Sequence, residues 1–296
     1  MSFNLRKYND QISRSQLCSF TFNNHHTTDL FVKRDDLIHP EVSGNKWRKL
    51  KWNLIGALQN KCNVISTYGG AYSNHLLATA SLGYDFGIQT RAYVRGDELN
   101  QSSNALLKRC HDLNMDLRFI NRQQYFTDKR TNGISVSDVD RIWNIPEGGA
   151  NKEGVEGCME IIQETSNDFD FIFVAQGTST TSMGILSAMN PNSTLVVVPV
   201  LKGYDSIKEM KWLHKEFDLK FDQSKIIVLD QFHFGGYAKH DAVLTDFVEE
   251  FNHSHTFRIE PVYTGKVMYA LKQYVQSKCL MHKKVLFVHT GGLDNK

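Results

Sequence analysis

From residue 63 to the C-terminus, short apolar runs alternate with longer amphipathic segments, and this pattern constrains the fold most. Strands are expected at 63–68, 89–94, 116–120, 170–175, 194–201, 225–229 and 284–289, and helices at 74–82, 102–113, 153–165, 182–189, 205–216, 242–251 and 266–277. A strand at 30–33 and a helix at 46–58 are expected before them. Because successive strands are joined through helices, the pattern predicts an α/β protein with parallel sheets covered by helices on both faces.

The composition argues against several classes of function. The 296 residues carry 34 basic and 32 acidic side chains, so nothing indicates a nucleic-acid partner. The longest apolar runs, such as 195–198, are far shorter than the ~20 residues that cross a bilayer, so no membrane partner is expected. Five scattered cysteines without a Cys-x-x-Cys pair favour free thiols over a metal site. With no apolar signal segment near residue 1, we expect a cytoplasmic protein.

A basic segment at 44–50, Gly-Asn-Lys-Trp-Arg-Lys-Leu, opens the helix expected at 46–58. A lysine at a helix start lies near the partly positive helix end, and burial would remove its hydration. Both effects favour the neutral amine, which can form a Schiff base. Lys46 is therefore a candidate covalent anchor for pyridoxal phosphate. The alternative is that Lys46 and the basic residues at 48, 49 and 51 form a solvated helix face, as charge runs usually do.

Residues 177–181 (Gly177, Thr178, Ser179, Thr180 and Thr181) lie between the strand expected at 170–175 and the helix expected at 182–189. A glycine and small hydroxyl residues at a helix start allow backbone N–H groups and hydroxyls to bind a phosphate with little net positive charge. The spacing is not that of a P-loop, and the chain has no G-x-G-x-x-G segment. The alternative is that these hydroxyls only cap the helix.

Two further glycine turns carry polar side chains. Ser73 and Asn74 follow a glycine pair at an expected helix start, where N–H groups and the Ser73 hydroxyl could bind a carboxylate. Simple capping of the helix is the alternative there. Tyr237 follows another glycine pair and could project its hydroxyl into a cleft, although tyrosine more often serves as half-buried packing.

Taken in order, these segments resemble those of the pyridoxal-phosphate enzymes related to 1-aminocyclopropane-1-carboxylate (ACC) deaminase and D-cysteine desulfhydrase. The matching segments are Asp35-Asp36 with 44–50, Ser73-Asn74, 177–181, Gly236-Tyr237, 261–266 (Pro-Val-Tyr-Thr-Gly-Lys) and Thr290-Gly291. The proline usual near the Gly-Tyr pair is missing.

The resemblance implies two open, twisted, mainly parallel sheets flanked by helices, the tryptophan synthase β-like fold of pyridoxal-phosphate enzymes. It also implies a large discontinuous domain, 1–50 with 150–296, a small domain, 51–149, and a homodimer.

The resemblance also implies a role for each site residue. The implied cofactor-binding residues are Asn45, Lys46, Asn74, Gly177, Thr178, Ser179, Thr180, Thr181, Thr264, Thr290 and Gly291. The implied substrate-binding residues are Ser73, Asn74, His75, Tyr237 and Tyr263. The implied catalytic residues are Lys46, Ser73, Tyr237 and Tyr263. Within these sets, Asn74 would bond the phenolic oxygen of the cofactor, and Thr264 would face its pyridine nitrogen.

Position 264 bears on the reaction. A hydroxyl there cannot balance a charged pyridine nitrogen, which suits β-elimination more than transamination. The related deaminases carry Glu at this place, and the D-cysteine desulfhydrase branch carries Thr. We therefore expect α,β-elimination from D-cysteine or a related small amino acid, giving pyruvate, ammonia and sulfide. The alternatives are ACC deamination to 2-oxobutanoate and ammonia, a pyridoxal-phosphate-binding protein without significant turnover, and a phosphate- or nucleotide-binding α/β protein without a covalent cofactor.

Overall fold

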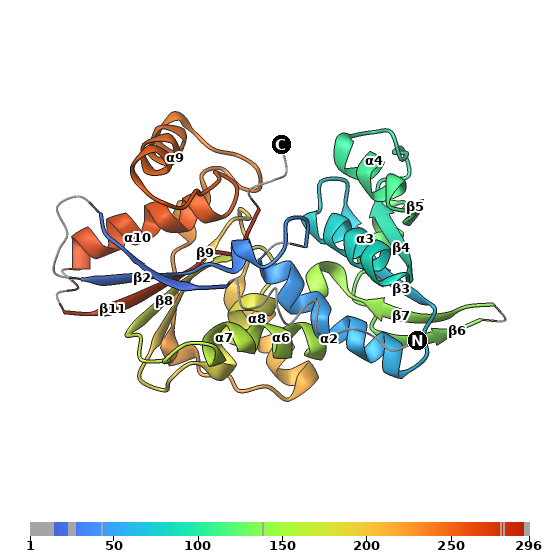
Figure 1. Ribbon diagram of the computed structural model, residues 1–296, viewed down its shortest axis with the longest axis horizontal. Helices are drawn as coiled ribbons and strands as arrows, with labels where there is room; N and C mark the ends of the chain where they lie inside the picture. Colours follow the sequence, from blue (N-terminus) through green and yellow to red (C-terminus); the bar gives the residue numbers. More distant parts are fainter. Residues whose placement is uncertain are drawn as a thin grey trace.

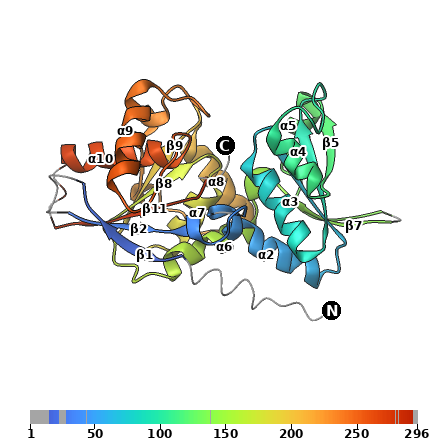
Figure 2. The ribbon, with the colours of Figure 1, turned by 45° about the horizontal axis from the view of Figure 1, so that its top comes forward.

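The computed structural model describes residues 15–22, 28–42, 44–137, 139–278, 280 and 282–292. The described strands form two sheets, which lie side by side in two lobes joined by helix α2 (Asn45–Gln59) (Figure 1). A view turned by 45° shows the same separation (Figure 2). The α/β class with mainly parallel sheets, predicted from the alternation of strands and helices, is therefore confirmed.

The larger sheet has the strand order β1-β2-β11-β8-β9-β10 among the described residues. The bounds are β1 Leu17–Phe20, β2 Asp29–Lys33, β8 Phe171–Gln176, β9 Thr194–Pro199, β10 Ile226–Val228 and β11 Lys284–Val288. Its neighbouring strands are parallel except for the pair β1–β2. One face is covered by α9 (Ala242–Ser254) and α10 (Thr264–Lys278), and the other by α6 (Lys152–Gln163), α7 (Thr180–Ala188) and α8 (Ser206–Phe217). Burial on both faces explains why β8, β9 and β11 are almost wholly apolar.

The smaller sheet has the strand order β5-β4-β3-β7-β6 in the described part of the chain. The bounds are β3 Val64–Gly70, β4 Gln89–Arg95, β5 Asp116–Ile120, β6 Gly133–Val136 and β7 Arg141–Ile145. Only the β6–β7 pair among these is antiparallel. The buried side chains of one face pack against α2, α3 (Asn74–Phe86) and α4 (Ala105–Asp112). Helix α5 (Arg122–Asp128) meets the other face, where the rings of Tyr125 and Tyr68 are in contact.

Helix α2 belongs to the packing of both lobes. Trp47 and Leu54 are buried in the apolar core beneath the smaller sheet. The helix also packs along α6, so closely that a Cβ atom at Gly157 would lie 1.8 Å from the carbonyl oxygen of Arg48. Only glycine fits at this contact, which fixes α2 against the large lobe.

The strands of the smaller sheet all fall within residues 64–145, and those of the larger sheet fall outside this range. The domain limits expected from the sequence, 1–50 with 150–296 against 51–149, would therefore place one boundary inside α2. This division of the chain into two domains stays a prediction.

No strand or helix was expected between 121 and 147, where α5, β6 and β7 lie. Strand β7 reads Arg-Ile-Trp-Asn-Ile, and its polar residue hides the strand pattern. Asn144 is nevertheless buried, because its amide oxygen accepts a hydrogen bond from Ser66 and its amide nitrogen donates to Ser135 (both 2.7 Å). A satisfied polar group of this kind can replace an apolar residue in a buried strand.

No helix among the described residues is long and apolar enough to cross a bilayer. Cys18, Cys62, Cys110 and Cys158 are free thiols. Cys279 lies outside the described residues.

Candidate active site

A cavity of about 520 Å³ lies between the two sheets. Most of the residues predicted for the site line it: Asn45, Lys46, Ser73, Asn74, His75, Gly177, Thr178, Ser179, Tyr237, Tyr263, Thr290 and Gly291. Thr180, Thr181 and Thr264 are fully buried and do not line it. The fold thus brings segments from both lobes and both ends of the chain to one place.

The Lys46 amine lines this cavity at the start of α2. Its Nζ atom donates a hydrogen bond to Asn45 Oδ1 (2.7 Å), and Asn45 Nδ2 donates to Thr181 Oγ1 at the start of α7 (3.0 Å). Burial, followed by the positive charge of Lys49, lowers the pKa of Lys46 to about 7. A substantial fraction of the amine is therefore neutral at physiological pH, as a nucleophile or base requires.

The alternative of a solvated basic helix face is wrong. Arg48 and Lys49 are buried, and Lys51 is paired with Glu160, with 2.8 Å between Nζ and Oε1. Charge runs usually indicate solvent, but the residues of this run turn toward α6 and the cavity.

Lys49 is a site residue that the sequence reasoning missed. Its Nζ atom donates hydrogen bonds to the Gly148 carbonyl (3.0 Å) and to Thr178 Oγ1 (3.2 Å), and burial lowers its pKa. The expected phosphate turn therefore has a buried amine beside it, rather than little positive charge. The spacing in the sequence could have identified it. Residues three apart share a helix face, and Lys49 follows Lys46 by three residues, so both side chains were to be expected on the same side of α2.

The covalent reactivity of Lys46 should follow its pKa. Only the neutral amine attacks an aldehyde, so capture of pyridoxal should be slow below pH 6 and rise to a plateau above pH 8, with a midpoint near pH 7. Lys49→Met should move the midpoint upward, because it removes a nearby positive charge that disfavours protonation. The measurement is the rate of appearance of lysine-bound pyridoxal absorbance in the cofactor-free protein. A wild-type midpoint near that of an ordinary lysine, about 10.4, would contradict this account.

The helices that begin at the cavity lack side-chain caps. No side chain accepts a hydrogen bond at the starts of α2, α3 and α7 in the described part of the chain. Five helices that start elsewhere are capped by Asn104 (α4), Asn121 (α5), Asn151 (α6), Asp205 (α8) and Asp241 (α9). The first N–H groups of an uncapped helix need other partners. At α3 and α7 these groups can bind an anion in the cavity.

His75, in the first turn of α3, is buried at the cavity wall. Its Nε2 atom lies 3.0 Å from Thr67 Oγ1, and its Nδ1 atom has no hydrogen-bond partner among the described residues. Burial, with the positive charges of Lys49 and Lys46, holds the pKa of His75 well below its ordinary value, so the ring is neutral. The family resemblance implies that His75 binds the substrate, and its unpartnered ring nitrogen is a candidate ligand atom.

Tyr237 and Tyr263 meet edge to face in the cavity, with 6.0 Å between ring centroids. Tyr237 Oη also donates a hydrogen bond to the Tyr72 carbonyl of the other lobe (3.1 Å). Burial raises the pKa of both phenols above the ordinary value. Both hydroxyls are therefore protonated at neutral pH and can donate a proton or a hydrogen bond, but they are poor bases.

The loop that carries Tyr237 is held by a buried lysine. Residues 234–236 all have positive φ angles, of 49°, 87° and 117°. Lys266 Nζ donates hydrogen bonds to the carbonyl of His233 (2.8 Å), just before this left-handed stretch, and to that of Gly236 (2.7 Å), its last residue. The lysine that ends the 261–266 motif thus fixes the backbone next to the active-site tyrosine.

The Thr264 hydroxyl is engaged within its own segment. Its Oγ1 accepts a hydrogen bond from the Glu260 backbone N–H (2.8 Å) and donates to Glu260 Oε1 (3.1 Å). The Glu260 carboxylate also accepts from the N–H groups of Val262, Tyr263 and Thr264 at 2.6–2.8 Å, so it caps the start of α10. The placement of Thr264 opposite a pyridine nitrogen stays a prediction.

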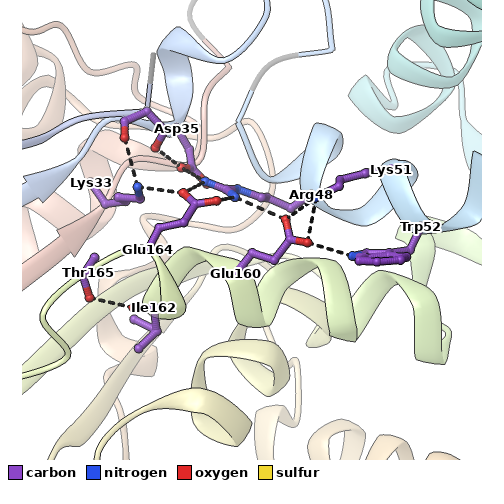
Figure 3. A network of polar contacts seen from close by, with 10 residues as sticks. Lys33, Asp35, Arg48, Lys51, Trp52, Glu160, Ile162, Glu164 and Thr165 are labelled. Carbon is purple, nitrogen blue, oxygen red and sulfur yellow. Dashed lines mark hydrogen bonds and ion pairs between the residues drawn. The ribbon is translucent and has the colours of Figure 1, made fainter. Parts of the chain in front are cut away.

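A buried ionic network anchors the start of α2 (Figure 3). Arg48 Nη2 lies 2.9 Å from Asp35 Oδ1 and 2.7 Å from Glu164 Oε2. Lys33 Nζ lies 2.9 Å from the same Glu164 oxygen. Burial alone would raise the pKa of Glu164, but the hydrogen bonds and charges of Arg48 and Lys33 hold it below its ordinary value. The network joins β2, α2 and α6 two residues from Lys46.

Comparisons with known proteins agree with this geometry. Residues 10–291 match the family model described as pyridoxal-phosphate dependent enzyme. A putative ACC deaminase of Thermotoga maritima is 28% identical over 287 residues, covering 90% of this chain and 89% of that protein. A bifunctional D-cysteine desulfhydrase/ACC deaminase of Arabidopsis thaliana is 28% identical and covers 90% and 73%.

Solved structures extend the agreement to the fold. The crystal structure of an ACC deaminase homologue has a TM-score of 0.73 at 25% identity, covering 90% of this chain and 85% of that chain. A hydrogen sulfide-producing enzyme from Fusobacterium nucleatum has a TM-score of 0.68 at 12% identity, covering 97% of each chain, and shows the fold alone. The chain belongs to the family of pyridoxal-phosphate dependent enzymes, and the resemblance found in its sequence is confirmed.

The residues present fit the cofactor of this family, pyridoxal 5′-phosphate. A phosphate fits at the uncapped start of α7, where backbone N–H groups and Thr178 meet the buried Lys49 amine. An aldehyde fits beside the partly neutral Lys46 amine in the same cavity. The alternative without a covalent cofactor is therefore not retained.

Proposed function

We propose that this enzyme releases ammonia from a small amino acid by α,β-elimination, with D-cysteine or a related compound as substrate and pyruvate, ammonia and sulfide as products. The observation that carries this proposal is the meeting, in one cavity, of a lysine whose pKa is lowered to about 7 and two tyrosines whose pKa is raised. A base and proton donors are thereby available together at neutral pH.

Different residues of the cavity would bind the cofactor and the substrate. Bound pyridoxal phosphate supplies an electron sink for the bond that breaks at the α-carbon. The start of α7 with Lys49 would hold the phosphate, and Asn74, Thr290 and Gly291 would hold the ring. The start of α3, with Ser73, would bind the substrate carboxylate through backbone N–H groups.

Proton transfer then involves three side chains. Lys46 Nζ would accept the α-proton of the substrate. Tyr237 or Tyr263 donates a proton to the sulfur as the Cβ–S bond breaks and its electron pair leaves with the sulfide. The enamine product reacts with water to give pyruvate and ammonia. Each group has the protonation state that its role requires.

The cavity carboxylates support elimination over transamination. Among the described lining residues, Glu41, Glu147 and Glu209 are each ion-paired to a cation, and none is free to balance a charged pyridine nitrogen. ACC deamination remains the second candidate, because relatives that match most of this chain carry that name. Cofactor binding without significant turnover is the third.

The decisive assay is product analysis on protein reconstituted with pyridoxal phosphate. We expect visible lysine-bound cofactor absorbance, and pyruvate with sulfide from D-cysteine. L-Cysteine and ACC serve as parallel substrates. Formation of 2-oxobutanoate from ACC without pyruvate from D-cysteine would reverse our order of substrates. Bound cofactor with no 2-oxo acid from any of them would favour the third candidate.

We also propose a homodimer and a cytoplasmic location. The family resemblance supports the first, and the free thiols of Cys18, Cys62, Cys110 and Cys158 support the second.

A further inference from the structure

Among the described residues that line the cavity, one cation has neither an anionic partner nor an assigned role. The described lining residues include three carboxylates: Glu41 pairs with Arg109, Glu147 with Lys129, and Glu209 with Arg130, at 2.8–3.0 Å. The remaining lining cations are Lys46, Lys49 and Arg95. Lys46 and Lys49 have the cofactor aldehyde and phosphate as partners. Arg95 has no anionic partner among the described residues.

The Arg95 side chain is exposed, and one aromatic ring contacts it. Arg95 is the last residue of β4, at the carboxyl end of a parallel strand, where α/β sheets bind ligands. Its guanidinium carbon lies 5.5 Å from the centre of the Tyr125 ring. That ring is fixed by its hydroxyl, which donates to Glu147 Oε1 (2.7 Å), and by contact with Tyr68. A cation over an aromatic face is attracted to it, so the guanidinium is partly preorganised.

The neighbouring strand makes room for this side chain. Gly70 lies opposite Arg95 in the β3–β4 register, and a Cβ atom there would lie 3.3 Å from Arg95 Nη2. Gly70 also begins the turn that leads to Ser73 and Asn74, which we assign to the substrate and the cofactor. The free N–H groups of Arg95 therefore lie next to the turn that binds the substrate carboxylate in the proposed function.

We propose that Arg95 binds the β-substituent of the substrate and selects amino acids whose β-substituent already carries negative charge, such as a phosphate or sulfate ester. This inference rests on the proposed elimination. The cofactor phosphate is assigned to α7 and Lys49 and the substrate carboxylate to α3, which leaves Arg95 for an anionic β-substituent. The guanidinium fork matches a tetrahedral oxyanion, with which it can form two parallel hydrogen bonds.

The same contact suits the chemistry. In the elimination, Lys46 takes the α-proton, the bond from Cβ to the leaving atom breaks, and its electron pair leaves with that atom. The leaving group therefore gains negative charge as the reaction proceeds, and the Arg95 cation stabilises it increasingly. With O-phosphoserine the products are inorganic phosphate, pyruvate and ammonia, the last two after the enamine reacts with water.

Binding without turnover tests the proposal directly. The probe is 2-amino-3-phosphonopropanoate, whose C–P bond does not leave, and 2-aminobutanoate is its uncharged comparator. For the cofactor-loaded protein, Arg95→Gln should weaken calorimetric binding of the phosphonate by about 10- to 100-fold, the range for a hydrogen-bonded charge, and leave 2-aminobutanoate unchanged. Arg95→Lys should fall between, because it keeps the charge and loses the fork.

The matched control is Arg118→Gln, on the adjacent strand β5, where the side chain is exposed and does not line the cavity. It should change neither affinity. Equal weakening of both probes by Arg95→Gln would show that Arg95 only supports the Gly70 turn, and would overturn the proposal. Unchanged phosphonate binding would also overturn it.

Turnover separates this inference from the proposed function. Arg95→Gln should raise the KM for O-phosphoserine but not for β-chloroalanine, whose β-substituent is uncharged, using both enantiomers of each. If no compound yields a 2-oxo acid, the proposed function fails while the calorimetric result still decides the role of Arg95.

Discussion

Lys46→Ala should abolish both covalent attachment of the cofactor and turnover. The Lys46 amine has a pKa lowered to about 7 and lies in the same cavity as the uncapped starts of α3 and α7. Loss of a general base alone costs roughly 10²- to 10⁴-fold in rate. Loss of the covalent anchor comes in addition, so we expect no activity above background and no lysine-bound cofactor absorbance.

Lys51→Ala is the matched control for this variant. It removes a lysine from the same helix, where the side chain pairs with Glu160 away from the cavity. It should bind cofactor and turn over like the wild type. If Lys46→Ala kept the absorbance of a lysine-bound cofactor, another amine would be the anchor, and Lys49 is the nearest candidate in the cavity wall.

Arg48→Met should lower the free energy of unfolding by about 3–5 kcal/mol, the range for a broken buried ion pair. Arg48 and Asp35 are both 0% exposed, so the variant leaves the Asp35 carboxylate buried without its cation. Glu164 loses the same partner (Figure 3). Urea denaturation of the cofactor-free protein measures the change. An unchanged slope of the unfolding free energy against urea concentration would show that the unfolded states of the two proteins are comparable.

Two further variants separate charge from packing. Asp35→Asn, added to Arg48→Met, should recover part of the lost stability, because the cost arises from an unpaired buried carboxylate. Arg118→Met breaks an exposed ion pair with Asp116 and should cost far less, since water screens it. A loss below about 1 kcal/mol for Arg48→Met would mean that the network contributes no more than a surface pair.

The fold could be predicted to the extent that it depends on local pattern. Strands such as 116–120 and helices such as 242–251 carry clear apolar periodicity, and the structure places elements there. The prediction of strands from apolar periodicity failed where a buried position holds a hydrogen-bonded polar side chain. Asn144 in β7 is an example, since its hydrogen bonds depend on strands distant in sequence.

The sequence predicted which segments form the site, but it did not predict all of the charged side chains that line it. Gly177 and Ser73 were expected at anion-binding helix starts, and both line the cavity. Lys49 and Arg95 were missed, because a lysine inside a charge run and an arginine at a strand end look like solvated residues in sequence. Their significance depends on which carboxylates lie nearby, and that is a property of the tertiary structure.

We propose that Lys46 is the residue that carries the cofactor. Reduction of the reconstituted protein with borohydride makes the lysine–cofactor bond permanent, and peptide mass spectrometry then locates it. We predict a pyridoxyl group on Lys46 alone. A pyridoxyl group on Lys49, or no modified lysine in a protein that shows the bound-cofactor absorbance, would show that Lys46 is not the anchor.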